Sequence, residues 1–315
     1  MAVGLARHVT AASRAVSARR GRFRRLTAEG LLPYALVSPA MLYIAALVGY
    51  PFFLALYFSL SNASVQEPVA RFVGLANFAA AVRDTIFRRA LLDSFVFTFG
   101  SLVGKALLGT TLAFLLLRPF PGRKVVRGLL MLPWTLPISL SILGWKWMFD
   151  PQFSVINWTA GHLGLIQRPY PNWLGDPLYA FIAVLTVNIW RGFPFSAIIV
   201  LAGLTSVPAE IVEAAKVDGA GFLRRWTTII VPMIAPILYV GLLFDTVFTF
   251  TDLSVVYLLT NGGPINATDI VPTVAFRTGI LGGSLGRGSA IALFMFPLLF
   301  LAVVTMLRTL RRREL

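Results

Sequence analysis

The sequence predicts an all-α polytopic membrane protein with six transmembrane helices. Of its 315 residues, 57% are apolar and only 13% are charged, whereas a soluble domain of this length needs far more polar surface. Six runs of eighteen or more residues are almost free of charge, and about 20 residues at 1.5 Å each cross the hydrocarbon core of a bilayer. These runs cover residues 34–58, 95–117, 128–149, 179–204, 233–256 and 288–307.

The first run, 34–58, is too long to be the apolar region of a cleaved signal peptide, which spans about 7–15 residues. It therefore counts as a span. In the second run, Gly100 and Gly104 stand four residues apart, a spacing that lets two helices pack closely in lipid. The loop 150–178 holds Trp158 and Tyr170, aromatic residues typical of the headgroup level.

The net charge of +15 is distributed unevenly among the segments that join the spans. The segments form two alternating sets. The set richer in Lys and Arg carries 18 of the 28 basic residues, and the poorer set carries seven although it contains more residues. The richer set is 1–33, 118–127, 205–232 and 308–315, and the poorer set is 59–94, 150–178 and 257–287. By the positive-inside rule, we expect the richer set, including basic tails at both termini, in the cytoplasm.

This topology, with attraction of the N-terminal tail to anionic membrane lipid, explains the basic charge without a nucleic acid partner. The chain has no cysteine and two histidines, His8 and His162, so neither thiol catalysis nor a metal site is expected. The segment Gly100–Ala106 is a poor phosphate loop, because it has three intervening residues instead of four and ends in Ala106 instead of Ser or Thr. We therefore expect no catalytic site, no ATPase and no bound cofactor in this chain.

A polar island interrupts the hydrophobic pattern at 205–232. Pro208 suits a first helical turn, and Gly219 and Gly221 suit the end of a helix because glycine adopts left-handed backbone without a Cβ clash. The island predicts a short helix, a turn and a second, basic helix, with Pro232 opening the fifth span. These features alone fit an ordinary helical loop between spans equally well.

The spacing within the island resembles the EAA loop of ABC importer permeases. Glu213-Ala-Ala215 is followed after three residues by Gly219, and after nine more by Ile229-Ile-Val-Pro232. The form Glu-Ala-Ala-Lys-Val-Asp-Gly-Ala is similar to that of the sugar and glycerol-phosphate uptake group. Other stretches that resemble this group are 72–78, 190–194, 250–253 and 259–264. Val231, where the group usually has Leu, is a small departure.

The resemblance implies a type I importer permease fold in a bacterial cytoplasmic (inner) membrane. It also implies three partners: a cytoplasmic ABC ATPase dimer that holds ATP and Mg, a second, related permease, and an extracytoplasmic solute-binding protein. The resemblance further implies that Glu213 anchors the loop in the ATPase, that Ala214 and Ala215 allow close docking, and that Gly219 permits the turn. The full set of expected coupling residues is Glu213, Ala214, Ala215, Asp218, Gly219, Ala220, Arg224 and Pro232.

The spans also carry polar residues that suit a solute pathway. An ionisable side chain at a helix centre costs about 2.5–3.5 kcal/mol on insertion, so such residues usually face a cavity or a partner. Asp245 and Asp252 are seven residues apart and share a helix face with Thr249. The expected pathway residues for a sugar or sugar-like solute are Asn188, Trp190, Asp245, Thr249 and Asp252.

Other interpretations of these polar residues remain open at this point. Asp252 can lie near the outer interface, Arg191 can pair with an acid, and Lys105 and Lys146 are expected to be interfacial or paired. The alternative function is a stand-alone secondary transporter or channel that uses Asp245 and Asp252 as ion sites. That alternative does not require the 213–232 spacing, and no second half of the chain resembles the first.

Overall fold

The computed structural model describes residues 28–67 and 70–311, with side chains from residue 33 to residue 310. Most of the predicted N-terminal tail, and residues 312–315 of the C-terminal tail, lie outside this range. Within it the regular secondary structure is helical, apart from one isolated β-bridge between Ser61 and Phe72. The predicted all-α class is thus confirmed. The chain divides into two units, Met1–Tyr57 and Phe58–Leu315.

The described part of the first unit is one long apolar helix. Helix α2 (Ala28–Ile44) continues through a π-helical stretch, η2 (Ala45–Gly49), into α3 (Tyr50–Ser59). Residues Pro33–Ser59 form a 27-residue segment that is long and apolar enough to cross a membrane. Its large apolar side chains, such as Leu36 and Phe53, are exposed, as expected for a helix whose surroundings are lipid or another protein.

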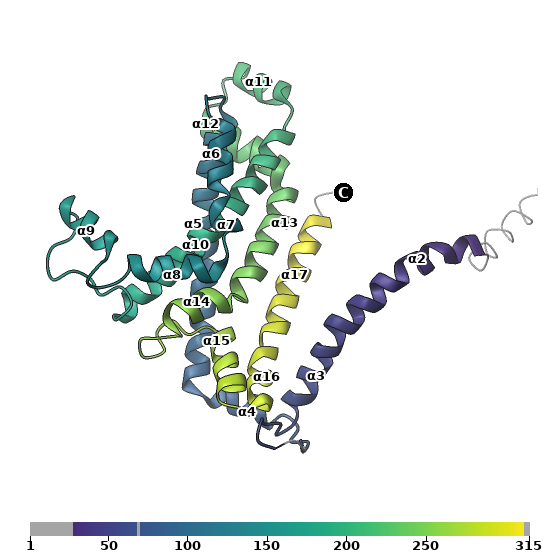
Figure 1. Ribbon diagram of the computed structural model, residues 1–315. Coiled ribbons are helices and arrows are strands. Elements are labelled where there is room, and N and C mark those ends of the chain that lie inside the picture. The colour runs from purple at the N-terminus through teal and green to yellow at the C-terminus, as the bar shows by residue number, and fades with distance from the viewer. Residues whose placement is uncertain (1–27, 68–69, 312–315) are drawn as a thin grey trace, which may run out of the picture. The chain divides into compact units, whose positions relative to one another are not determined.

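Two long helices form the centre of the second unit. Helix α5 (Thr85–Leu117) packs along α10 (Pro177–Ser206), and α13 (Val231–Phe250) contacts both (Figure 1). The contact is close because α5 carries glycine there. A Cβ atom at Gly104 would overlap Ile189, and one at Gly109 would lie 2.8 Å from the Cβ of Ser196. Glycine at 104 therefore serves close helix packing, as the sequence predicted.

Both central helices begin before the charge-free runs, 95–117 and 179–204, from which they were predicted. The carboxylate of Asp84 accepts a 2.8 Å hydrogen bond from the backbone N–H of Ile86, and Asp176 likewise accepts from Leu178 at 2.9 Å. Each aspartate is thus an N-cap. The first turns of α5 contain Arg88, Arg89 and Asp93, so a search for uncharged residues begins too late.

The third predicted span, 128–149, differs most from the continuous helix that we expected. It forms α6 (Arg123–Leu130), α7 (Leu132–Thr135) and α8 (Ile138–Met148), with a bend of 94° between Arg123–Thr135 and Ile138–Met148. The break falls at Leu136, which is extended (φ −67°, ψ 142°). The ring of Pro137 disfavours helical backbone in the residue before it, and this explains the bend. Helix α9 (Val155–His162) follows.

The fifth and sixth predicted spans are also divided. Helix α13 ends at Phe250 and α14 (Leu253–Thr260) begins after Asp252, whose side chain caps it. The sixth run consists of α16 (Leu285–Leu293) and α17 (Met295–Arg311). In the described part of the chain, five helices are long and apolar enough to cross a membrane, or six if the bent pair at Arg123–Met148 is one span.

Shorter elements gather at the two ends of the second unit. Helix α11 (Ala209–Val217), α12 (Phe222–Arg225) and α6 lie at one end, with the π-helical η3 (Trp226–Ile230) leading into α13 (Figure 1). Helix α4 (Ala76–Arg83), α15 (Val271–Phe276) and η4 (Arg277–Leu281) lie towards the other end, where α16 packs against α4. Segments 118–127 and 205–232 therefore share one end, as their common basic charge led us to expect.

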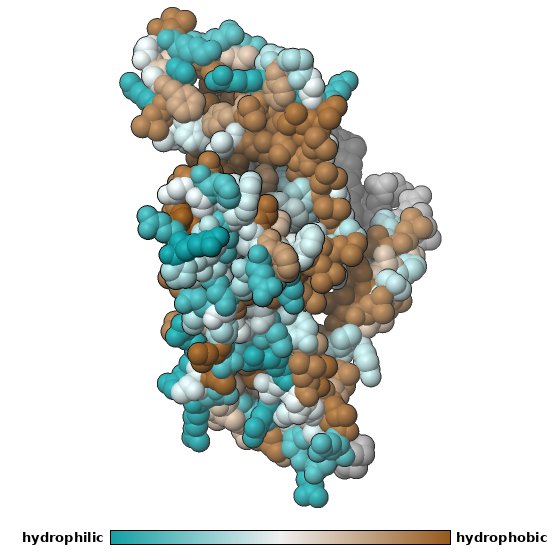
Figure 2. Space-filling view, turned by 60° about the vertical axis from the view of Figure 1, so that its left-hand side comes forward, coloured by the Kyte–Doolittle hydropathy of each residue, from teal (hydrophilic) through white to brown (hydrophobic). Residues whose placement is uncertain are grey.

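The surface of the molecule is strongly apolar in places. On the face shown in Figure 2, apolar side chains form a band beside a more hydrophilic strip. Large exposed apolar residues occur on several helices, including Leu107 on α5 and Phe300 on α17. Contiguous exposed apolar surface of this kind is typical of a protein that is covered by lipid or by another subunit.

Candidate functional site

The polar island folds as a helix, a turn and a second helix. In α11, Glu213 and Ala214 are exposed, whereas Ala215 is buried. Asp218, also exposed, follows the last residue of the helix. Gly219 then adopts a φ of 76°, the left-handed conformation that favours glycine. The turn predicted at Gly219 is thus present.

The turn is fixed by hydrogen bonds on both sides. The backbone N–H of Ala220 donates to the carbonyl oxygen of Ala215 at 2.9 Å, which is the pattern that closes a helix with a left-handed residue. The guanidinium of Arg225 donates to the carbonyl oxygen of Ala220, while Arg224 is exposed. These bonds tie the end of α11 to the start of α12.

The second helix leads directly into the membrane-spanning part. Helix α12, η3 and α13 are continuous, and Pro232 lies in the first turn of α13, two positions after the π-helical stretch η3 ends. The ring of Trp226 lies 4.8 Å from that of Phe114 on α5, measured between centroids. The island is therefore anchored to both α13 and α5.

A buried polar cluster joins α5, α10 and α13. The ammonium group of Lys105 donates to the hydroxyl of Thr249 at 2.7 Å and lies 3.9 Å from a carboxylate oxygen of Asp245. The hydroxyl of Ser196 donates to the other oxygen of Asp245 at 2.6 Å. All four residues are buried, and a buried charge needs such partners because its own hydration has been lost.

Asp252 extends this cluster towards α14. Its carboxylate accepts a 2.8 Å hydrogen bond from the side-chain amide of Asn188 and lies 3.9 Å from the guanidinium of Arg191. Its other oxygen accepts from the backbone N–H of Val255 at 3.2 Å, which caps α14. The acid pairing considered for Arg191 is thus present, and Asp252 lies at a helix break rather than within a continuous span.

The two parts of the cluster line one cavity of about 320 Å³. Two polar atoms of lining residues, the side-chain oxygen of Asn188 and the Nε of Arg191, are buried without a hydrogen-bond partner among the described residues. Aromatic surface is supplied by Trp134 and Phe248, whose ring centroids lie 6.3 Å apart. The complete lining is Lys105, Trp134, Asn188, Arg191, Gly192, Asp245, Phe248, Thr251, Asp252, Leu253 and Ser254.

The structure brings together four of the five predicted pathway residues. Asn188, Asp245, Thr249 and Asp252 belong to the cluster. Trp190 is not among the residues lining the cavity; its ring packs instead against Trp145, with centroids 5.4 Å apart. The reason is helical geometry, because a residue two positions after Asn188 lies about 200° around the helix.

Sequence reasoning left Lys105 and Trp134 out of the pathway set. Lys105 was expected to be interfacial or paired, and it is paired with Asp245 while lying 4% exposed at the centre of the cluster. The signal was a lysine in mid-span with Gly192 on a facing helix: a Cβ atom at Gly192 would overlap the Cε of Lys105. Trp134 could have been found from Pro133 and Pro137, which turn the chain beside it.

Another ion pair, with a fully buried carboxylate, lies near the opposite end, next to the 259–264 stretch. The guanidinium of Arg277 donates to the fully buried carboxylate of Asp269 at 2.5 Å, and the hydroxyl of Thr273 donates to the same carboxylate at 2.9 Å. Burial raises the pKa of Asp269 to about 6, against the lowering effect of Arg277. The guanidinium also donates to Asn266 at 3.0 Å, which fixes the loop between α14 and α15.

Comparison with known proteins places the chain in a family. Residues 105–313 match the family described as "Binding-protein-dependent transport system inner membrane component". The chain belongs to this family. It is therefore a multi-pass inner membrane protein and a permease subunit of an ABC importer, and the stand-alone transporter is not favoured.

Relatives of this permease cover nearly all of it. It is 30% identical over 286 residues to the trehalose/maltose transport system permease protein MalF of Thermococcus litoralis, which covers 91% of this chain and 96% of that protein. It is 31% identical over 287 residues to the sulfoquinovosyl glycerol transport system permease protein SmoG of Agrobacterium fabrum, covering 91% and 92%. The predicted uptake group is thus confirmed.

A solved structure shows the same fold. A chain of a bacterial ABC transporter involved in the import of the acidic polysaccharide alginate superposes with a TM-score of 0.77, covering 92% of this permease and 99% of that chain. The sequence identity is 21%, so this likeness concerns the fold alone. The importer permease fold predicted from the EAA-like spacing is confirmed by this match and by the family.

Proposed function

We propose that this permease imports a sugar or sugar-like solute and that residues 205–232 couple it to a separate ATPase. The observation that carries the proposal is the position of α11, which is a short, exposed helix at one end of a polar-lined bundle. The turn at Gly219 and the continuous path through α12 and η3 join it firmly to α13. Movement imposed on α11 is therefore transmitted to the helix that carries Asp245 and Thr249.

The exposed surface of the island suits docking into another protein. Ile211 and Val217 on α11 and Phe222 and Leu223 on α12 are exposed apolar side chains, and Val217 is 87% exposed. Burying such residues in a protein cleft is favourable, at about 25 cal/mol per Å² of apolar area. Exposed Glu213 then supplies a charged anchor, with Asp218 and Arg224 as polar contacts at the edge. Ala214 is small enough for the partner to approach closely.

The proposed assembly contains a cytoplasmic ABC ATPase dimer, a second, related permease and an extracytoplasmic solute-binding protein. ATP and Mg belong to the ATPase. A fold neighbour has been solved in a complex with an alginate pentasaccharide-bound periplasmic protein, which supports the last of these partners. We place both termini, and the end with α6 and α11, in the cytoplasm because these segments hold most of the basic residues.

A carbohydrate suits the cavity that the polar cluster lines. The unpartnered side-chain oxygen of Asn188 accepts a hydroxyl hydrogen, and the Nε of Arg191 donates to a hydroxyl oxygen. Trp134 supplies a flat apolar surface of the kind that packs against a sugar ring. Relatives named for trehalose and maltose, sulfoquinovosyl glycerol and diacetylchitobiose support this class of solute. In this arrangement Trp134 takes the role that the sequence suggested for Trp190.

An ion-coupled transporter fits the cluster less well. Asp245 already accepts a hydrogen bond from Ser196 and lies beside Lys105. Asp252 accepts hydrogen bonds from Asn188 and from a backbone N–H, and it is paired with Arg191. A carboxylate that binds and releases an ion or a proton needs free oxygens or a mobile partner. Ion pairing inside the bundle accounts for both aspartates without ion coupling.

The test begins with mild-detergent purification of the tagged chain from its native membrane and mass spectrometry of its partners. We expect an ABC ATPase and a second permease. The complex, reconstituted in liposomes with its binding protein, should take up sugar only with ATP. Glu213→Lys or Gly219→Asp should abolish uptake. Glu67→Lys, the same charge reversal on an exposed residue at the opposite end, should not.

Two results would overturn the proposal. One is a chain that purifies alone and transports without ATP under an ion gradient. The other is full ATP-driven uptake by the Glu213→Lys complex, which would show that α11 does not couple hydrolysis to transport. ATP-driven uptake of amino acids but not of sugars would retain the coupling and reject the solute class.

A further inference from the structure

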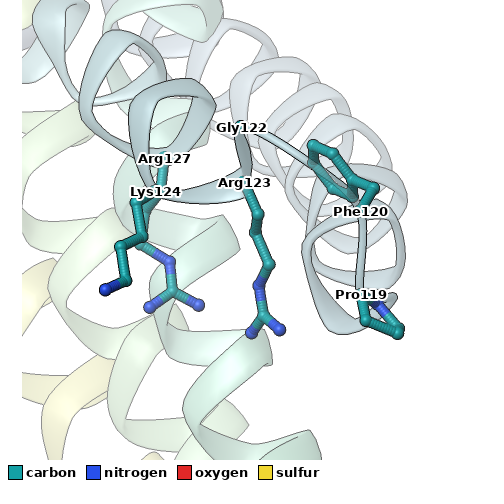
Figure 3. A pocket seen from close by; sticks show the side chains of 6 residues that line it. All are labelled: Pro119, Phe120, Gly122, Arg123, Lys124 and Arg127. Carbon is teal, nitrogen blue, oxygen red and sulfur yellow. The ribbon is translucent and has the colours of Figure 1, made fainter.

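A strongly basic cavity lies where α5 ends and α6 begins. Its volume is about 610 Å³, within the range of small-molecule sites. Six residues line it, three of them basic and none acidic: Pro119, Phe120, Gly122, Arg123, Lys124 and Arg127 (Figure 3). The proposed coupling and solute pathway use none of them.

The local sequence explains why the three basic side chains converge. Gly122 has a φ of 79°, which lets the chain reverse between α5 and α6. Residues 123, 124 and 127 then share one face of α6, because positions i and i+4 are neighbours on a helix. Figure 3 shows the three long side chains extending to the same side, into the space beside Pro119 and Phe120.

An adjacent face of α6 holds this geometry in place. Val126 and Leu130 pack against an apolar cluster that includes Leu204 of α10 and, around its edge, Phe114 and Trp226. The basic face is therefore directed away from the core. Pro119 and Pro121, whose rings fix the backbone angle φ, limit the motion of the loop.

These charges have no acidic partner among the residues whose side chains the structure describes. The four ion pairs recorded there involve Arg89, Lys105, Arg191 and Arg277. Three positive charges on one short helix repel one another, and an anion in the cavity would relieve that repulsion. Guanidinium groups bind phosphate oxygens in particular, because their N–H groups match two oxygens at once.

The place of the cavity in the chain indicates that the anion belongs to a lipid. Leu117 is the last residue of α5, and Thr85–Leu117 is long and apolar enough to cross a membrane. The basic residues begin six positions later, at the level where hydrocarbon gives way to headgroups. The acyl chains of a phospholipid hold its phosphate at this level, whereas a free phosphate ion has no such attachment.

We propose that Arg123, Lys124 and Arg127 form a binding site for the phosphate headgroup of an anionic phospholipid. The lipid closes the space between α5 and α6 and holds α6 against the cluster that contains Trp226. Since Trp226 follows α12, a bound lipid stabilises the end of the bundle that carries 205–232. The site does not depend on the identity of the solute.

The experiment uses the purified complex of this chain with its native partners, delipidated in detergent. Native mass spectrometry measures lipid retained after adding phosphatidylglycerol, phosphatidylcholine or inorganic phosphate in separate arms. The test variant is Arg123→Gln/Lys124→Gln/Arg127→Gln. The control is Arg71→Gln/Arg83→Gln/Arg88→Gln, which removes three exposed charges at the opposite end.

We expect saturable binding of phosphatidylglycerol by the wild type and the control. The affinity should fall about fivefold for each basic residue removed, so about a hundredfold in the triple variant. Phosphatidylcholine should bind at least tenfold more weakly than phosphatidylglycerol. If the triple variant does not assemble, Lys124→Gln alone should still lose about fivefold.

Three results would overturn the proposal: equal binding of phosphatidylglycerol by the triple variant and the control, equal binding of the two lipids by the wild type, or displacement of the lipid by millimolar inorganic phosphate. The last result would identify a site for a soluble phosphate instead of a lipid.

Discussion

The ammonium group of Lys105 donates a 2.7 Å hydrogen bond to the hydroxyl of Thr249, a residue 144 positions away in the sequence. This bond joins α5 to α13 beneath the surface of the bundle, and the nearby carboxylate of Asp245 balances the lysine charge at 3.9 Å. Since α13 is continuous with the island at 205–232, two members of the Lys105 cluster, Asp245 and Thr249, lie on the helix that continues from the proposed coupling loop. A change at Lys105 is therefore expected to affect both stability and transport.

Lys105→Met should destabilise the permease by about 3 kcal/mol. Methionine has a similar length, but it leaves Asp245 buried and charged without its counter-ion, and removal of one partner of a buried pair costs about 3–5 kcal/mol. The midpoint of unfolding in mixed micelles, followed by tryptophan fluorescence, measures the loss. The double variant Lys105→Met/Asp245→Asn removes both charges and should regain most of it. A double variant less stable than Lys105→Met would contradict the ion-pair interpretation.

Gly192→Ala should act through Lys105. The added methyl group would overlap the Cε of Lys105, so the lysine must withdraw and lose its bond to Thr249. Overpacking of this kind costs about 1–3 kcal/mol. In a Lys105→Ala background the methyl group has room, and Gly192→Ala should add little. Unfolding midpoints of the four proteins form a double-mutant cycle, and strictly additive effects would count against direct contact.

Gly219→Ala should weaken coupling between ATP hydrolysis and uptake, whereas Gly221→Ala should not. Space is open around both glycines, so only the backbone distinguishes them. Gly219 has a φ of 76° and Gly221 a φ of −64°. A residue with a Cβ atom in the left-handed region costs about 1–2 kcal/mol, which shifts the turn that orients α11. The measurement is the number of ATP molecules hydrolysed per solute imported in liposomes; equal ratios in the two variants would contradict this role for the turn.

Much of the fold could be predicted because hydrophobic runs and caps are local signals. Charge-free stretches found the helices, and the chain positions of Pro208 and Gly219 gave the ends of α11. The bend between α7 and α8 was missed because a search for apolar residues does not register Pro137, although the proline makes Leu136 extended. Helix starts were misplaced where charged turns, such as that of Arg88, precede the apolar part.

The polar cluster was only partly predictable, because it depends on helix packing. Asp245 and Thr249 share a face by their spacing alone, which the sequence indicates. The partnership of Asp245 with Ser196 and Lys105 depends on the rotation of α10 and α5 about their axes, and no local pattern specifies it. Rotation also explains why Trp134 lines the cavity and Trp190 does not.

Asp269→Asn should change how the stability of the permease depends on pH. Burial raises the pKa of Asp269 from 3.8 to about 6 in the folded protein. The folded state therefore binds a proton that the unfolded state releases, and this stabilisation is complete below pH 3.8 and is lost as pH rises through about 6. Two pKa units correspond to about 3 kcal/mol.

The Tm of the wild type should therefore rise relative to the Tm of Asp269→Asn as pH falls from 7.5 to 5. Both Tm values are measured by tryptophan fluorescence in detergent. The exposed control Glu67→Gln should keep a constant difference from the wild type over this range. Parallel pH profiles for the wild type and Asp269→Asn would mean that Arg277 and Thr273 hold the carboxylate ionised throughout.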